Sequence, residues 1–368
     1  KSLNIRQLSN LIKQMEIDIG LLNENYYGLF PRLVWESARV SVFSEMLREV
    51  IGYKDAYISS RKQVKPGFME SFVKGVRLLM NVTLNGWLCA PRKKEWLIFQ
   101  HPRRRLRSDG VYEDIYTDEF ISEIPPEKRV VIDNPHHGVH YKPRSHKVWY
   151  IDANILIKIL MKPLINRQYV KEQNAVNQMS VDVNSYLSEV IQQNLNFTKS
   201  IKRNAYKLCT KVKVYRVLLR WLKPEKILLV VGHGHEGLII AAHELGISTV
   251  EVQHGIVSPD HLAYSFMPNT SKLSFSDYFL LFGNFWKNAV HWPIDNSRLI
   301  EIGFPYFDRT IQEVNNNKKQ NRAVCISQGT IGEEISRFMA ALAENNNCEI
   351  DLVYKMHPGE VVNWEERY

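Results

Sequence analysis

Three loops that combine histidine and glycine with other polar residues each follow a short apolar run of strand length. They lie at residues 232–237, 253–255 and 355–360. The ends of buried strands give no packing reason for such side chains, so the three loops together indicate a site that does chemistry. A histidine or carboxyl group with a pKa near neutrality can take the proton of an attacking hydroxyl group. We predict this catalytic work for Glu236, His254 and His235.

A glycine-rich turn at residues 327–332 has the composition of a phosphate-binding loop. It precedes a predicted helix that begins with Glu333 and Glu334. Free backbone N–H groups at the start of a helix can hold a phosphate, whereas the two acidic residues could equally be ordinary charges at a helix N-terminus. A leaving phosphate also needs donors that stabilise its charge. The residues predicted to bind a phosphorylated donor are Gln328, Gly329, Thr330, Gly332, Lys355, His357, Pro358 and Glu360.

Arginines and acidic residues alternate with tyrosines over residues 101–118. Such an arrangement at the end of a strand could hold a polyhydroxylated or anionic acceptor. It could also be a surface loop of ion pairs that neutralise one another. The predicted acceptor-binding residues are Arg103, Arg104, Asp114, Tyr116 and Asp118.

Two histidine clusters raise the question of a metal site. His233, His235, Glu236 and His254 include the ligand types that zinc prefers, and His136, His137 and His140 form a second group. A lone His-x-His spacing predicts metal binding poorly, and a glycine-rich setting suits a substrate loop better. We therefore expect neither a metal nor another cofactor.

The elements that must position these residues are strands that alternate with helices. Helices are predicted at 182–222 and 237–245, with Gly246 as the stop signal of the second. This alternation indicates a parallel sheet, and ligands of such sheets bind at the carboxyl ends of the strands. The predicted strands are residues 96–99, 130–132, 148–151, 227–231, 249–252, 278–282 and 299–302.

The chain divides into three predicted regions. Residues 1–90 have helical apolar spacing, for example at Leu8, Ile12 and Met15. After a polar run at 315–320, a new alternation begins with strand 323–327, helix 333–343 and strand 350–354. We expect an α/β protein with a helical region at 1–90, a first Rossmann-like domain at 91–314 for the acceptor, and the start of a second at 315–368 for the donor. The second would be truncated, because a whole domain of this kind needs about a hundred residues.

Composition bounds the class of protein. Hydrophobic residues make up 45% of the chain and charged residues 24%, as in soluble globular proteins. No apolar run is long enough to span a membrane, and the first twenty residues do not have the pattern of a signal peptide. The four cysteines have no CxxC spacing. We expect a cytoplasmic protein with reduced thiols.

The net charge of +9 is concentrated in two segments. Residues 199–226 carry ten Lys or Arg against one acid, and a second basic cluster covers 92–107. A basic helix can contact nucleic acid, an anionic bilayer or an anionic substrate, or it can simply be a solvated face. We expect peripheral contact of helix 199–226 with the inner face of the cell membrane, and no nucleic-acid partner.

A family resemblance rests on several successive blocks. Gln253-His254-Gly255, Ser276-Asp277-Tyr278 and Ile302-Gly303-Phe304-Pro305 are among them, together with Tyr264, Pro268, Phe282-Gly283 and Asp308. Over residues 227–360 the chain resembles glycosyltransferases of the GT-B type that assemble bacterial capsule and O-antigen. The resemblance implies two Rossmann-like domains that face each other across a cleft.

Two shorter motifs refine the resemblance. Lys355-Met356-His357-Pro358 resembles the HP motif of bacterial sialyltransferases and Kdo transferases, which implies that His357 contacts the phosphate of a cytidine nucleotide. The His254-Gly255 pair is similar to that of CDP-glycerol glycerophosphotransferases, which implies a base role for the histidine. Sialyltransferases also have an acidic D/E-D/E-G motif, for which this chain has His235-Glu236-Gly237.

Three functions remain open at this point. The first is a glycosyltransferase that moves a sugar from a nucleotide-sugar donor (CMP-linked favoured, UDP- or GDP-linked next) to a growing bacterial surface glycan, free or lipid-linked. The second is an enzyme similar to UDP-sugar 2-epimerases, with the same double-Rossmann architecture. The third is a binding module for polysaccharide or nucleic acid without catalysis.

Overall fold

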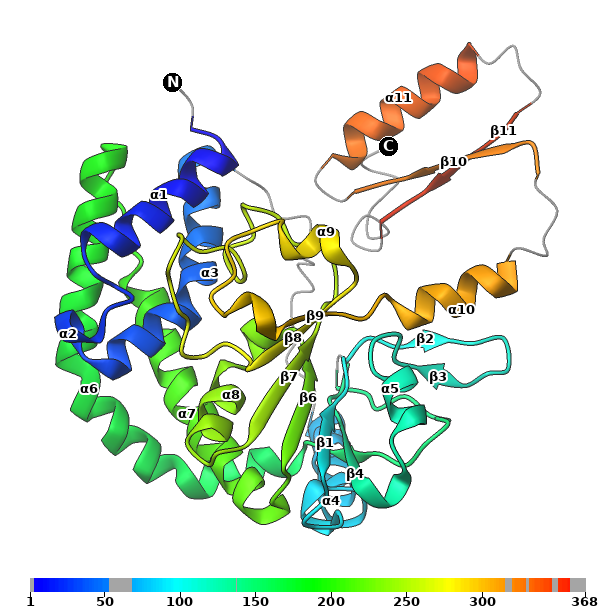
Figure 1. The fold of residues 1–368 in the computed structure, drawn as a ribbon, viewed down its shortest axis with the longest axis horizontal. Helices are drawn as coiled ribbons and strands as arrows, with labels where there is room; N and C mark the ends of the chain where they lie inside the picture. Colours follow the sequence, from blue (N-terminus) through cyan, green and yellow to red (C-terminus); the bar gives the residue numbers. More distant parts are fainter. Residues whose placement is uncertain are drawn as a thin grey trace.

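The computed structural model describes residues 3–52, 68–136, 138–314, 320–328, 331–345 and 350–357. Within these residues the main sheet has seven strands in the order β5-β4-β1-β6-β7-β8-β9 (Figure 1). Every neighbouring pair is parallel. From β1 the chain adds strands first on one side and then on the other, which is the order of a doubly wound fold. The prediction of an α/β fold with a parallel sheet is confirmed.

All seven strands lie where apolar runs predicted them. Their side chains alternate between two cores: Leu97 and Phe99 pack in one, and Ile98 packs in the other. Because both faces of the sheet are covered, the strands are nearly continuous apolar runs in the sequence. The strands are β1 (Trp96–Phe99), β4 (Arg129–Asp133), β5 (Trp149–Tyr150), β6 (Lys226–Val230), β7 (Ser248–Val252), β8 (Tyr278–Leu281) and β9 (Leu299–Glu301).

Helices cover both faces of the sheet. Helices α7 (Thr198–Leu222) and α8 (Glu236–His243) pack on one face, and α5 (Asp118–Glu123) packs on the other (Figure 1). After α8, Gly246 adopts the left-handed backbone conformation with φ at +68°, as the predicted stop signal requires. A small antiparallel hairpin of β2 (Arg105–Leu106) and β3 (Tyr112–Glu113) follows β1.

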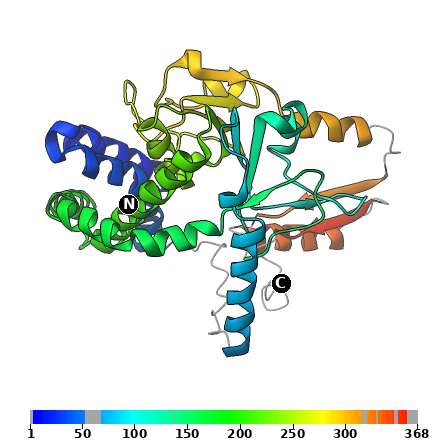
Figure 2. The same cartoon turned by 90° about the horizontal axis from the view of Figure 1, so that it is seen from below.

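The N-terminal helices share a core with α7. Helices α1 (Ile5–Asp18), α2 (Glu24–Tyr27) and α3 (Leu29–Ile51) pack against α6 (Ala153–Ile191) and α7. Helix α4 (Phe68–Leu84) instead stands away from the body of the molecule (Figure 2). The helical character predicted for the described part of residues 1–90 is therefore confirmed.

The segment predicted as one helix over 182–222 contains two helices. Helix α6 ends at Ile191, and the next residue, Gln192, has a left-handed backbone with φ at +58°. The side chain of Asn184 then accepts a hydrogen bond from the N–H of Phe197 at 2.8 Å, and Asn196 accepts one from Thr198 at 3.1 Å. These polar side chains stabilise a reversal of the chain, so that α7 packs along α6 instead of continuing it.

A separate parallel pair forms the C-terminal unit. Strands β10 (Arg322–Ile326) and β11 (Asp351–Lys355) flank helix α11 (Gly332–Glu344), and α10 (Pro305–Val314) precedes them. The two strands and the helix lie where the sequence predicted them. The described residues after 320 thus form one β-α-β unit, the repeating unit of Rossmann-like domains.

Candidate functional site

The candidate site lies where the strand order reverses, between β1 and β6. Ligands of doubly wound sheets bind at this point, outside the carboxyl ends of the strands. Here the ends of β1, β6 and β7 bring the predicted segments 101–118, 232–237 and 253–255 to one edge of the sheet. We call the group the carboxyl-edge site, and it consists of His101, Tyr116, His233, His235, Glu236, Glu251, His254 and Tyr264.

The turn from β6 into α8 is built around two glycines. The N–H of Gly232 donates to Glu251 Oε1 at 2.7 Å, and a Cβ at Gly232 would lie 2.1 Å from Glu251 Oε2. A Cβ at Gly237 would lie 2.4 Å from Cβ of Lys211 on α7. Both contacts are too close for any other residue. At Gly234, in contrast, a Cβ would meet no described atom within 4 Å.

These two situations allow a matched test of the turn. We expect Gly232→Ala to lower the free energy of unfolding by about 2 kcal/mol or more, because the new methyl group displaces the Glu251 carboxylate from its partners. Gly234→Ala should change it by less than about 0.5 kcal/mol. Urea unfolding of both variants checks this, and equal losses for the two would contradict the geometry of the turn.

Glu236 is the first residue of α8 and lies directly behind this turn. Its side chain is buried, with 4% of the residue exposed. Burial raises the pKa of Glu236 to about 7, although the positive charges of Lys272 and Lys211 act in the opposite direction. A carboxyl group with such a pKa exchanges a proton readily at neutral pH.

The histidines around Glu236 are neutral at pH 7. Burial lowers the pKa of His233 to about 3 and the pKa values of His235 and His254 to about 4, and nearby positive charges add to the effect. The rings of His233 and His254 have centroids 5.8 Å apart, whereas His235 packs beside Phe99 at 6.0 Å. The Nδ1 atoms of His233 and His235 are buried without a hydrogen-bond partner among the described residues.

A chain of polar contacts orients His254. Tyr264 Oη donates to Glu251 Oε1 at 2.7 Å and lies 3.5 Å from His254 Nδ1. Because the phenolic proton goes to Glu251, we assign the Nδ1 proton of His254 as the donor to Tyr264. The lone pair at His254 Nε2 then stays available to accept a hydrogen bond. Glu251 was not predicted as a site residue, although a single acid inside an apolar strand was a signal that could have found it.

Tyr116 connects the predicted acceptor segment to the predicted catalytic loop. Its hydroxyl donates to the carbonyl oxygen of His254 at 2.9 Å, and its ring lies 5.3 Å from that of His101. The Tyr116 ring also stacks with the ring of Phe304, with 6.1 Å between the centroids. Two segments that are far apart in the sequence therefore form one surface at the carboxyl edge.

Arg104 and Asp114 do not face the solvent, which corrects their predicted role. The side chain of Arg104 is 1% exposed and pairs with Asp133 at 2.6 Å and with Asp114 at 3.6 Å. Asp114 also accepts hydrogen bonds from the N–H of His101 and the hydroxyl of Thr117, both at 2.7 Å. The ion pairs considered as an alternative do exist, but they are buried. These two residues hold the loop in place, and Arg103, Tyr116 and Asp118 remain the predicted acceptor contacts.

Asp118 and Asp133 belong to the same buried network. Burial and the charge of Asp114 raise the pKa of Asp118 to about 7. Burial also acts to raise the pKa of Asp133, but the hydrogen bond with His140 and the charge of Arg144 lower it overall. His140 itself lies between two carboxylates, 2.5 Å from Asp133 and 2.7 Å from Asp152. The network fixes the loops that leave β1 and β4.

The C-terminal unit brings several predicted donor residues to one edge. The N–H of Ser327 donates to the carbonyl oxygen of Lys355 at 2.9 Å, so the turn after β10 lies beside the loop after β11. Gln328 and Lys355 are exposed, His357 is half-buried, and Gly332 is buried at the start of α11. Of the remaining predicted residues, Gly329, Thr330, Pro358 and Glu360 lie outside the described residues, as does His137.

Two further observations concern metals and membranes. In the described residues no group of three or more His, Cys, Asp or Glu side chains is arranged to hold a metal ion. Across the same part of the chain, none of the helices combines the length and apolar character that a membrane span requires. Comparison with known proteins found no matching family model, no matching curated protein and no matching solved structure.

Proposed function

We propose that the chain is a glycosyltransferase that moves a sugar from a nucleotide-sugar donor to a growing bacterial surface glycan. One observation carries the proposal: Glu236, a buried carboxyl group with its pKa raised to about 7, lies at the carboxyl edge where the strand order reverses. This is where a doubly wound sheet binds its ligand, and the group suits removal of a proton from an acceptor hydroxyl.

The proposed reaction uses both parts of the chain. The donor phosphate lies against the turn after β10, near Lys355 and His357, and the acceptor lies over Arg103 and Tyr116. The acceptor oxygen bonds to the anomeric carbon of the sugar as the bond from that carbon to the phosphate oxygen breaks. The hydroxyl proton goes to Glu236, and the nucleotide leaves with the bonding electrons. A GT-B arrangement, in which the two units face each other across a cleft, is part of this proposal.

The carboxyl-edge histidines would serve this reaction without carrying charge. His254 is held through Tyr264, and its Nε2 can accept a hydrogen bond from a sugar hydroxyl. Because its pKa of about 4 makes it a weak base, we assign proton removal to Glu236. His235, also predicted as catalytic, packs beside Phe99 of the core, so we assign it to shaping the pocket behind Glu236.

A nucleotide screen tests the donor site. We expect one of CMP, CDP, UDP, GDP and dTDP, with CMP favoured, to bind in calorimetry. His357→Ala should weaken the binding of that nucleotide by about tenfold, because a hydrogen bond to a charged phosphate is lost. His291→Ala is the matched control, because it replaces an exposed histidine that is far along the chain from the predicted donor loops at 327–332 and 355–360.

The same screen separates the alternatives. If none of the nucleotides binds to the folded chain, the donor site is wrong and a binding module becomes the better interpretation. If a UDP-sugar binds and is epimerised without any acceptor, the chain is an epimerase-like enzyme. Equal binding by wild type and His357→Ala would remove His357 from the site.

A further inference from the structure

Helices α4 and α6 direct apolar side chains toward solvent. The C-terminal half of α4 packs on the core through Leu78 and Val82, and α6 has Ile157 and Ile165 on its inner side. The helices are therefore apolar on both sides, which is unusual for helices at a protein surface. Exposed fractions run from 39% to 74% for the outward-facing residues, which are Val73, Val76, Leu79, Met80 and Leu84 on α4 and Ile155, Leu156, Ile159, Leu160 and Leu164 on α6.

The two apolar stripes meet where α4 ends and α6 begins. Asn81 near the end of α4 donates to Asp152 at 3.2 Å, and Trp87 donates to Asn154 in the first turn of α6 at 2.9 Å. The end of α4 and the start of α6 are thus held together. We call the combined surface the α4–α6 face, and it consists of the ten outward-facing residues named above.

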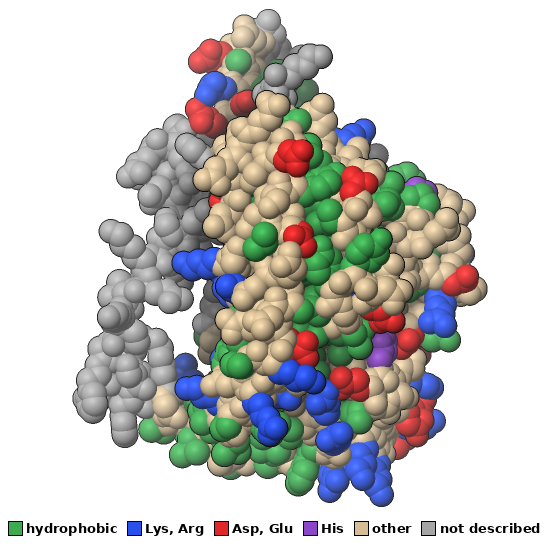
Figure 3. Space-filling model, turned by 90° about the vertical axis from the view of Figure 1, so that its left-hand side faces the viewer, with side chains coloured by type: hydrophobic (Ala, Val, Ile, Leu, Met, Phe, Trp, Pro, Cys, Tyr) green, Lys and Arg blue, Asp and Glu red, His purple; other side chains and the backbone are tan. Residues whose placement is uncertain are grey.

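The charges carried by the segments that form the α4–α6 face are positive, and the carboxylate at their junction, Asp152, lies 2.7 Å from His140 Nε2. Residues 73–94, 142–150 and 153–171 contain no Asp or Glu. Figure 3 shows hydrophobic side chains beside lysines and arginines along the lower edge of the molecule. Cationic residues of the three segments include Arg77, Arg92, Lys93, Lys94, Lys142, Lys147, Lys158, Lys162, Arg167 and Lys171. Arg144 is different, because its side chain is buried and pairs with Asp133 at 2.7 Å.

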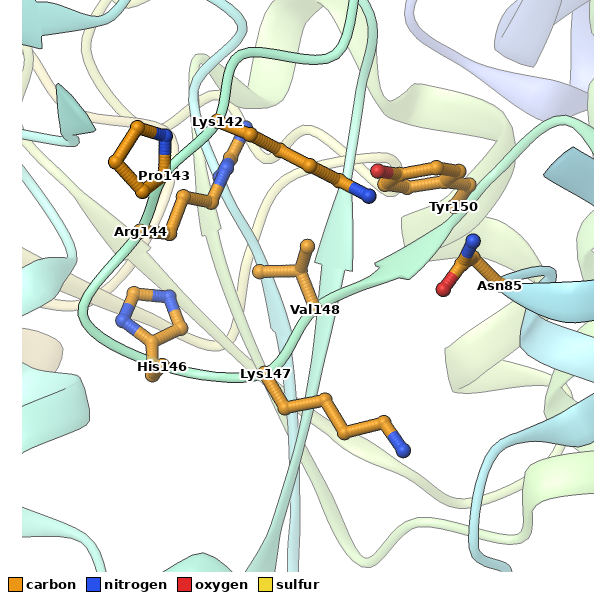
Figure 4. Close-up of a pocket in the computed structure, with 8 residues that line it drawn as sticks. All are labelled: Asn85, Lys142, Pro143, Arg144, His146, Lys147, Val148 and Tyr150. Atoms are coloured by element: carbon orange, nitrogen blue, oxygen red, sulfur yellow. The ribbon is translucent and has the colours of Figure 1, made fainter. Parts of the chain in front are cut away.

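A basic pocket lies at the junction of the two stripes. It has a volume of about 490 Å³, and Asn85, the residue after Leu84, forms one of its walls. In Figure 4 the Lys142 side chain points toward the ring of Tyr150, and Arg144, His146 and Lys147 line the same hollow. His146 is 9% exposed, and its Nε2 has no hydrogen-bond partner among the described residues; Asp118 Oδ1 is 3.9 Å away.

We propose that the α4–α6 face docks on an anionic phospholipid bilayer. The apolar side chains enter the boundary of the acyl region, the lysines and arginines lie among the headgroups, and the pocket takes a lipid phosphate. Apolar stripes bordered by cations are what binding at the bilayer surface requires. Because the other residues of the three segments supply no negative charge, the face complements an anionic surface. This inference does not depend on glycosyl transfer.

Helix α7, which the sequence analysis favoured for the membrane contact, has a different surface. Trp221 is the large apolar side chain it exposes among the described residues. Several of its cations have partners within the fold: Lys211 donates to the carbonyl oxygen of Gly234 at 2.7 Å, and Arg216 pairs with Glu244. The helix therefore offers charge without an apolar surface to insert.

Co-sedimentation with vesicles tests the proposal. We expect the protein to bind equimolar phosphatidylcholine–phosphatidylglycerol vesicles but not phosphatidylcholine alone. Ile159→Ser with Leu160→Ser should weaken binding by about tenfold or more, since two inserted side chains are lost. Lys142→Glu with Lys147→Glu should weaken it by about tenfold or more, since two cations near the headgroups become anions.

Two control variants complete the experiment. Val181→Ser changes an exposed residue in the other half of α6 and should leave binding unchanged. Lys199→Glu with Lys202→Glu reverses charges on α7 and should have less effect than the pocket variant. Unchanged binding by the α4–α6 variants, or loss confined to the α7 variant, would overturn the proposal. So would a wild-type dimer, seen by sedimentation velocity, that Ile159→Ser with Leu160→Ser dissociates. The vesicle experiment contains neither a sugar donor nor an acceptor. A protein that does not bind the vesicles would therefore not contradict the proposed reaction.

Discussion

Glu236→Gln is expected to lower the turnover number by about a hundredfold to ten-thousandfold, the range that loss of a general base produces. Glutamine keeps the size of the side chain but cannot take a proton. Binding of the nucleotide should change little, because the donor residues lie in the C-terminal unit. Steady-state kinetics with the nucleotide sugar identified by the screen would measure the effect.

The pH dependence follows from the pKa of about 7. A base must be deprotonated, so wild-type activity should rise with pH through 7 and level off above it, and the rise should disappear in Glu236→Gln. The free energy of unfolding should instead fall as the pH rises. The folded state keeps the Glu236 proton up to about pH 7 while the unfolded state loses it near 4.5. Stability is therefore lost between these values, by about 3 kcal/mol in total.

The variant consequently has two opposite readouts. At pH 8 Glu236→Gln should be more stable than wild type, because it buries no charge, and the difference should vanish near pH 4. Glu244→Gln changes a more exposed acid just after α8 and serves as the control for both measurements. A variant that loses activity and stability together at pH 8 would indicate a structural role for Glu236 instead of a catalytic one.

The central strands of the main sheet were predictable because they are buried on both faces. Residues 130–132 and 227–230, for example, are apolar runs that no polar residue interrupts. The order of the strands was not predictable, since an apolar run does not specify which strand lies beside it. The break between α6 and α7 was also missed, because the helical spacing continues on both sides and the reversal depends on hydrogen bonds of the Asn184 and Asn196 side chains.

The candidate site could be predicted in part for a similar reason. Loops after parallel strands must share an edge, so placing Glu236 and His254 at one edge of the sheet required only the order of the elements. The contacts that hold them could not be predicted. Glu251 lies inside β7, and its partners Gly232 and Tyr264 come from other segments. Arg104 lies in a charged segment of the sequence, where a surface position is expected, and only the fold shows that its side chain is buried.

The largest expected effect on stability concerns a buried ion pair that supports the site from behind. Arg39 on α3 donates to both carboxylate oxygens of Glu16 on α1, at 2.7 and 2.8 Å, and the two side chains are 0% and 2% exposed. Arg39 also donates to the carbonyl oxygens of Leu262 and Ser265, the residues around Tyr264. The pair therefore ties two N-terminal helices to the segment that orients His254.

Arg39→Met is expected to lower the free energy of unfolding by about 3 to 5 kcal/mol, because Glu16 is left buried without its partner. Its remaining hydrogen bond in the interior, from Trp35 Nε1 at 2.8 Å, cannot replace two charged donors. Chemical denaturation would measure the loss. As a control, Arg203→Met breaks an exposed ion pair, at 3.7 Å, between Arg203 on α7 and Glu45 on α3, the helix that carries Arg39. This change should lower the free energy of unfolding by less than about 1 kcal/mol.

A double variant separates loss of the pair from loss of packing. Glu16→Leu with Arg39→Met replaces both charges by apolar groups and should recover most of the stability that Arg39→Met loses, since the unpaired buried carboxylate is gone. It should not restore the hydrogen bonds to Leu262 and Ser265. If those contacts position Tyr264, the double variant will fold stably and still have reduced activity. A stable double variant with full activity would show that the pair serves stability alone.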